Sequence, residues 1–88
     1  MVGTAPGLDI AAITIRRHSI EIHTDHWYVG CRGTVVLVSS VGELTRKDAG
    51  FLDAVCELIG RAVEGLRREA NCIVLEVEGG VALRLGWP

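Results

Sequence analysis

Aromatic side chains are scarce in this sequence: two Trp, one Tyr and one Phe make up 5% of the 88 residues. Basic residues are not concentrated either, because the nine Lys and Arg are spread along the chain and the formal net charge is -2. Nucleic-acid binding depends on a concentrated positive field, often with aromatic residues between the charges. We therefore expect no nucleic-acid partner.

Long apolar runs are absent as well. The run Val35–Val38 is far shorter than the ~20 residues that a membrane-spanning helix needs, so we expect no membrane association. The first seven residues, Met-Val-Gly-Thr-Ala-Pro-Gly, lack the basic start and apolar core of a signal peptide. We expect residues 1–7 to be a flexible tail, residues 8–88 to form a single domain, and the protein to be cytoplasmic.

The three cysteines are odd in number and have no Cys-x-x-Cys spacing, which favours reduced, mostly buried thiols over a disulfide or zinc framework. No Gly-rich phosphate loop with its lysine, no Gly-x-Ser-x-Gly elbow and no Cys/His nucleophile motif is present. The sequence therefore predicts no cofactor and favours a protein that is not an enzyme.

What the sequence has in quantity is apolar residues, which make up 49% of the chain and give a mean hydropathy of +0.35. A chain this short buries only about 60% of the surface that its unfolded form exposes. Part of the apolar surface is then expected to lie between subunits, which predicts a homo-oligomer, most simply a dimer.

The segment Thr45–Gly60 carries the clearest helical pattern. Phe51, Val55, Leu58 and Ile59 recur at intervals of three and four, which predicts one buried face. Thr45 is a suitable N-cap, with Asp48 in the position of the acidic residue of a capping box, and Gly60 suits a left-handed C-terminal position.

Strand patterns lie on both sides of this helix. They cover 10–15, 19–25, 27–31, 34–40 and a terminal hairpin about Gly79-Gly80, with Arg32-Gly33 as a further two-residue hairpin turn. The sequence thus predicts an α+β fold: an antiparallel sheet of about five to six strands with one central helix packed on one face. The run Val35–Val38 is apolar on both faces of its strand, so its second face needs another layer.

Residues 61–70 are ambiguous. Ala62, Val63, Leu66 and Ala70 continue the helical spacing, whereas Gly60 and Gly65 oppose a helix. An internal duplication favours a strand: an offset of 53 residues places Val63 on Ile10, Leu66 on Ile13, Ile73 on Ile20 and Leu75 on Ile22. The duplication predicts that Val63–Arg68 is extended, as Ile10–Ile15 is.

Residues 50 to 85 resemble a small uncharacterised bacterial domain family common in actinobacteria. The resemblance lies in Gly60-Arg-Ala-Val63 and in the hairpin Ile73-Val-Leu75-Glu-Val77-Glu-Gly79-Gly80-Val-Ala-Leu83-Arg-Leu85. That family has a helix, then Gly-x-x-Val and a Leu-x-Leu-x-Phe-x-Asp-Gly-x-x-Leu-x-Val hairpin. This chain departs from it at Val77 and Gly79, and the resemblance implies no activity.

Two sets of side chains could carry chemistry. Glu21, His23 and Asp25 share one face of a predicted strand, where a desolvated carboxylate and imidazole could perform acid–base chemistry with Arg32 as an anion-binding companion. His23, His26 and Cys31 could ligate a metal ion, although a sharp turn at Asp25-His26 would be needed. The alternative reading for both sets is the solvent-facing side of a sheet.

The predicted function is protein–protein interaction as a homodimer, with another protein as a further candidate partner. A small enzyme or a metal- or metabolite-binding protein is the alternative. Aromatic residues at strand ends and outward apolar residues are the interface candidates. They are Trp27, Tyr28, Val36, Val38 and Trp87.

Overall fold

The computed structural model describes residues 8–86; the predicted tail, residues 1–7, and Trp87 lie outside this range. Within it the fold is mostly β, with eight strands in two antiparallel sheets and one short helix, so the predicted α+β fold with five to six strands and a central helix is wrong. The elements are β1 Ile10–Ile15, β2 Ile20–Thr24, β3 Tyr28–Cys31, β4 Val35–Ser39, β5 Gly42–Thr45, α1 Phe51–Cys56, β6 Val63–Arg68, β7 Cys72–Val77 and β8 Val81–Gly86.

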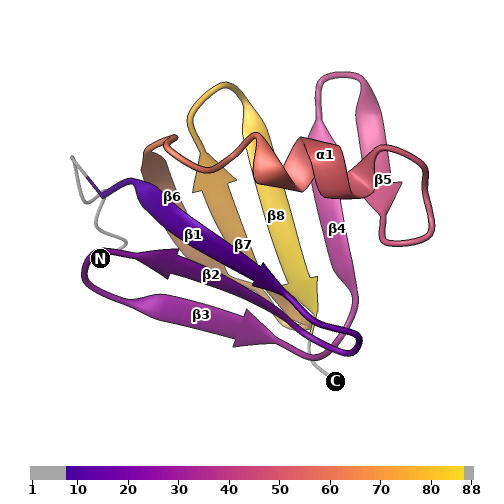
Figure 1. Ribbon diagram of the computed structural model, residues 1–88, viewed down its shortest axis with the longest axis horizontal. Helices are drawn as coiled ribbons and strands as arrows, with labels where there is room; N and C mark the ends of the chain where they lie inside the picture. Colours follow the sequence, from indigo (N-terminus) through magenta and orange to yellow (C-terminus); the bar gives the residue numbers. More distant parts are fainter. Residues whose placement is uncertain (1–7, 87–88) are drawn as a thin grey trace.

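A small sheet has the strand order β1-β2-β3, and a large sheet has the order β5-β4-β8-β7-β6. Figure 1 shows the small sheet and α1 on the same side of the large sheet, with the small sheet over the β6 and β7 end and α1 over the β4 and β5 end. The chain passes from the small sheet to the large one between β3 and β4. The predicted hairpin at Arg32-Gly33 is therefore wrong, because β4 pairs with β8 and β5 instead of β3.

The core fills the space between these layers. Alternate residues of each strand face inward, as the period of two requires, and the helix adds one apolar stripe. The buried residues of this core are Ile10, Ile20, Ile22, Cys31, Val35, Leu37, Phe51, Val55, Leu58, Val63, Leu75, Val77, Leu83 and Leu85.

Helix α1 is much shorter than predicted. Thr45 belongs to β5, where it pairs with Val36, and the helix begins only after Gly50, whose φ of 86° is typical of glycine. The predicted pairing of Thr45 with Asp48 exists but closes a turn before the helix, since Asp48 Oδ2 accepts hydrogen bonds from the Thr45 amide and hydroxyl. Phe51, Val55 and Leu58 are buried as predicted, whereas Ile59 is 46% exposed.

Gly60, with a φ of 91°, ends the turns that follow α1. The next segment, Val63–Arg68, is strand β6, so the extended conformation predicted by the duplication is confirmed. The Gly79-Gly80 hairpin is also confirmed, because both glycines have positive φ and join β7 to β8.

The duplication extends to the pairing of individual residues. We call β1–β3 the first unit and β6–β8 the second unit. The β1/β2 pairs Ile13↔Ile22 and Ile15↔Ile20 recur 53 residues later as Leu66↔Leu75 and Arg68↔Ile73, and both strand pairs carry a register shift at the same relative position. The third strands, β3 and β8, match with an offset of 54, since Ile22↔Val29 corresponds to Leu75↔Leu83.

The two units also meet in a symmetric way. Asp9 pairs with Ala62, its own equivalent at the offset of 53. The Ile10 amide donates to the Arg61 carbonyl at 2.9 Å, and the Val63 amide donates to the Leu8 carbonyl at 2.8 Å, which is the same bond with the units exchanged. The first and second units are therefore related by a local two-fold axis near Asp9 and Ala62.

Candidate interaction surfaces

The outward face of the small sheet brings together two of the predicted acid–base residues. Glu21 and His23 project from β2 on the same side, and Oε1 of Glu21 lies 3.1 Å from Nε2 of His23. The ring of Tyr28, on β3 opposite His23, stacks on the imidazole with ring centroids 5.3 Å apart. This carboxylate, imidazole and phenol form a polar row across the two strands.

Asp25 and Arg32 lie away from this row at opposite ends of the hairpin. Asp25 belongs to the β2–β3 turn, which the Thr24 hydroxyl closes by hydrogen bonds with the backbone of His26 and Trp27. Arg32 follows the far end of β3, four residues beyond Tyr28, which is about 13 Å along a strand. The structure thus pairs Glu21 with His23 but does not bring Arg32 to them.

The predicted metal ligands point in different directions. Cys31 is buried on the inward face, and its Sγ donates to the Gly86 carbonyl at 3.2 Å. His23 projects from the outward face, and His26 lies in the exposed β2–β3 turn. Among residues 8–86, no group of three or more His, Cys, Asp and Glu side chains is placed to hold a metal ion.

Strand β3 forms one edge of the small sheet (Figure 1). Of the interface candidates, Trp27 precedes this strand and Tyr28 is its first residue. The Thr24 amide donates to the Trp27 carbonyl, so the backbone groups of Trp27, Val29 and Cys31 face β2 in the alternating antiparallel pattern. The N–H and C=O groups of Tyr28 and Gly30 therefore face outward. The Tyr28 side chain is 66% exposed beside them.

Val36 and Val38 lie on the outward face of the large sheet, opposite α1 and the small sheet. An ion pair of 2.8 Å between Arg84 on β8 and Glu43 on β5 spans the intervening strand β4, which carries these two valines. Long side chains of this kind shield apolar neighbours with their aliphatic stems, and both valines are half-buried. The second layer that Val35–Val38 was predicted to need is thus supplied in part by an ion pair.

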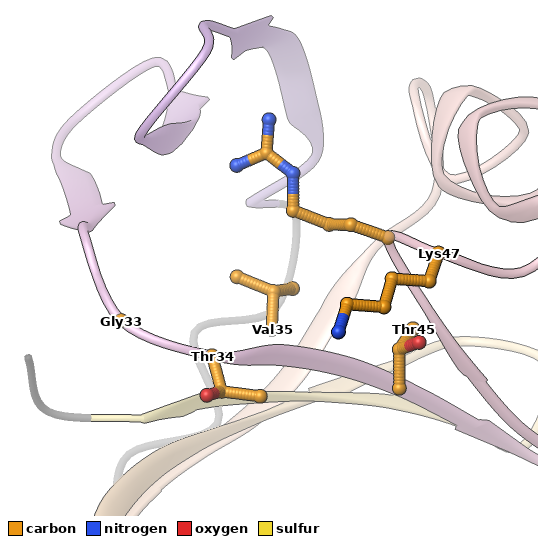
Figure 2. A pocket seen from close by; sticks show the side chains of 6 residues that line it. Gly33, Thr34, Val35, Thr45 and Lys47 are labelled. Carbon is orange, nitrogen blue, oxygen red and sulfur yellow. The ribbon is translucent and has the colours of Figure 1, made fainter.

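A shallow pocket of about 290 Å³ lies where β4 begins and β5 ends. Figure 2 shows Thr34, Val35, Thr45 and Lys47 around its opening, with the Lys47 amine directed into it. The Arg46 guanidinium donates to the Arg16 carbonyl, which draws the β1–β2 turn to the same end of the molecule.

This pocket was not predicted, because its residues are far apart in the sequence. Five of the nine basic residues lie in the three segments that meet at this end, with Asp48 as the neighbouring acid: Arg16, Arg17, Arg32, Arg46 and Lys47. The pairing of β4 with β5 and the hydrogen bond from Arg46 to Arg16 bring the segments together. No run of charges in the sequence could have indicated it.

No helix described in the structure is long and apolar enough to cross a membrane. Comparison with protein-family models, with curated proteins and with solved structures finds no match. The resemblance to a small bacterial domain family therefore stays a prediction.

Proposed function

We propose that this protein acts by protein–protein interaction as a homodimer. The observation that supports the proposal is the open edge of the small sheet at β3, where the outward backbone groups of Tyr28 and Gly30 lie beside an exposed aromatic ring. An open strand edge is a template for adding another strand, and exposed tyrosines are frequent anchors of interfaces.

The apolar composition agrees with this proposal. The side chains of Tyr28, Leu52 and Ile59 are 66%, 53% and 46% exposed, although the inward faces of both sheets are already filled. Burying such groups between subunits stabilises the dimer by about 25 cal/mol per Å² of apolar area removed from water.

Light scattering during gel filtration tests the proposal directly. A homodimer has twice the 9.5 kDa mass of the chain, and its fraction falls on dilution. A protein that stays monomeric from micromolar to millimolar concentration contradicts the proposal.

A second candidate function rests on the Glu21–His23 pair with its stacked Tyr28. A carboxylate that holds an imidazole in one orientation is the arrangement of a general base, and the exposed face of Tyr28 could receive a small ring-containing ligand. A thermal-shift screen of metabolites against wild-type protein and His23→Ala tests this function. A ligand that stabilises both proteins equally does not use the pair.

A further inference from the structure

The two units of the duplication differ at one edge. In the second unit, β4 pairs with β8 at Val36↔Arg84 and Val38↔Ala82. Through the offset of 54, Ala82 and Arg84 are the equivalents of Tyr28 and Gly30 on β3. The first unit therefore has, at its β3 edge, the same outward backbone groups that hold β4 in the second unit, and no strand of the described chain covers them.

Each of the other sheet edges carries at least one protecting feature. Strands β1 and β6 carry register shifts near their starts, and both are engaged there through the Asp9–Ala62 pair. The end of β5 is capped by the Asp48 carboxylate. Strand β3 is short, with four residues, Tyr28–Cys31, but within this length it has no charged residue, no proline and no register shift. These three features commonly prevent edge pairing.

We infer that β3 pairs antiparallel with β3 of a second copy, about a two-fold axis at Val29, so that the two small sheets become one continuous sheet. This inference rests on the proposed homodimer and names its interface. The outward N–H and C=O groups of Tyr28 then form hydrogen bonds with the C=O and N–H groups of the partner's Gly30. The two-fold axis repeats this arrangement, so two closely spaced pairs of antiparallel hydrogen bonds form. The pairing of β4 with β8 shows the same geometry within one chain.

The side chains favour a second copy of this chain over an unrelated strand. Tyr28 and Gly30 are both on the outward face, so antiparallel pairing about Val29 places each Tyr28, whose ring stacks on His23 within its own chain, directly across from the partner's Gly30. An aromatic residue beside a glycine on a neighbouring strand shields the exposed glycine backbone. Gly30 has space for this, since a Cβ there would meet only the Glu21 side chain, at 3.6 Å.

The inward face of the same pairing is apolar. Val29 packs partly against the core, and the two-fold axis brings it next to the partner's Val29 as a non-hydrogen-bonded pair, in which side chains approach most closely. Trp27, also partly buried, flanks this contact and would cover it from the end of the strand. Both faces of the joined strands are thus occupied by complementary groups.

The first test is Gly30→Pro. Its N–H faces away from β2, so proline leaves the bonds of β3 to β2 in place and removes the bond to the partner. Two bonds are lost across the two-fold axis, and we expect the dissociation constant of the dimer to rise by about tenfold to a hundredfold. Tyr28→Lys should weaken the dimer similarly, whereas Val41→Lys, at a 94% exposed position in the β4–β5 turn, should not.

Hydrogen exchange of the wild-type protein gives an independent readout that does not depend on a variant folding. The Tyr28 and Gly30 amides should exchange slowly well above the dissociation constant of the dimer and rapidly well below it. The Glu43 amide, which faces outward from edge strand β5, should exchange rapidly at both concentrations.

The outcomes separate the interface from the proposed function. A monomeric wild-type protein overturns both. A dimer that survives Gly30→Pro, or in which the Tyr28 and Gly30 amides exchange as rapidly as that of Glu43, overturns the β3 interface but leaves the homodimer standing. A dimer that is lost on Val38→Lys and kept in Gly30→Pro assigns the interface to the outward face of the large sheet.

Discussion

The first and second units have the same strand pairing but different outward faces. On the first unit the central outward residues are Glu21, His23 and Tyr28; their equivalents on the second unit are Val74, Glu76 and Ala82. The inward residues, by contrast, are mostly aliphatic in both, for example Ile22 and Leu75. The duplication is thus preserved in the core. The units differ on their outward faces and at the outer side of their third strands, β3 and β8.

The largest expected effect tests whether the cores of the units are equivalent. Ile22 and Leu75 are both fully buried at matched positions. We expect Ile22→Ala and Leu75→Ala each to lower the free energy of unfolding by about 2–5 kcal/mol, because each leaves a cavity between the sheets. Urea denaturation of both variants measures this. A loss below about 1 kcal/mol at one position alone would show that its unit is peripheral to the core.

A pair of matched proline substitutions tests the difference between the outer sides of β3 and β8. Arg84 is the equivalent of Gly30, but its N–H faces β4 in the ladder. Arg84→Pro should destabilise the monomer by about 1–3 kcal/mol, because it leaves a carbonyl of β4 without its donor. Gly30→Pro should change the monomer by less than about 1 kcal/mol. Equal losses, measured below the dissociation constant of the dimer, would mean that the β3 edge is already occupied within the chain.

A smaller effect concerns the ion pair on the outward face of the second unit. Glu43→Gln removes the partner of Arg84, both side chains being largely exposed, at 58% and 40%. We expect a loss of about 0.2–1 kcal/mol that diminishes at high salt, since exposed pairs are screened. Thermal unfolding at low and at molar salt measures it. A loss that does not change with salt would contradict a screened ion pair between Glu43 and Arg84.

The smallest effects concern the cysteines. Desolvation and the nearby Glu69 carboxylate raise the pKa of the Cys72 thiol above its usual value, so the reactive thiolate forms at higher pH. Cys72 should react with iodoacetamide more slowly at pH 8 than the exposed Cys56, and buried Cys31 should react only on unfolding. Mass spectrometry of the alkylated peptides measures the order. Equal rates for Cys56 and Cys72 at pH 8 would contradict the raised pKa.

The parts of the fold that the sequence predicted are those governed by local alternation. The strands of both units and the Gly79-Gly80 hairpin follow from aliphatic residues at every second position and from glycines with positive φ. The duplication resolved residues 61–70, because Leu66 and Leu75 repeat the roles of Ile13 and Ile22.

The parts of the fold that the sequence did not predict depend on the pairing between strands and not on local alternation. The segment Gly42–Thr45 has no strand pattern of its own and becomes β5 only because β4 offers an edge. The predicted helix begins later than expected, because Thr45 pairs in β5 and residues 46–50 form the turn that follows it. On the candidate site, the contact of Glu21 with His23 follows from the period of two, whereas the stacking on Tyr28 depends on the register of β2 with β3. The cations around the Figure 2 pocket meet only through the tertiary fold.

The Asp9–Ala62 pair has a consequence for folding kinetics. Every strand pair within a unit joins neighbours in the sequence, so each unit can form from local hairpins on the microsecond scale. Contact between the units closes a loop of about 50 residues, whose entropy must be lost before the shared core compensates for it. We therefore expect the docking of the two units to be the slow step of folding, and changes in the segment that links them to act mainly on the folding rate.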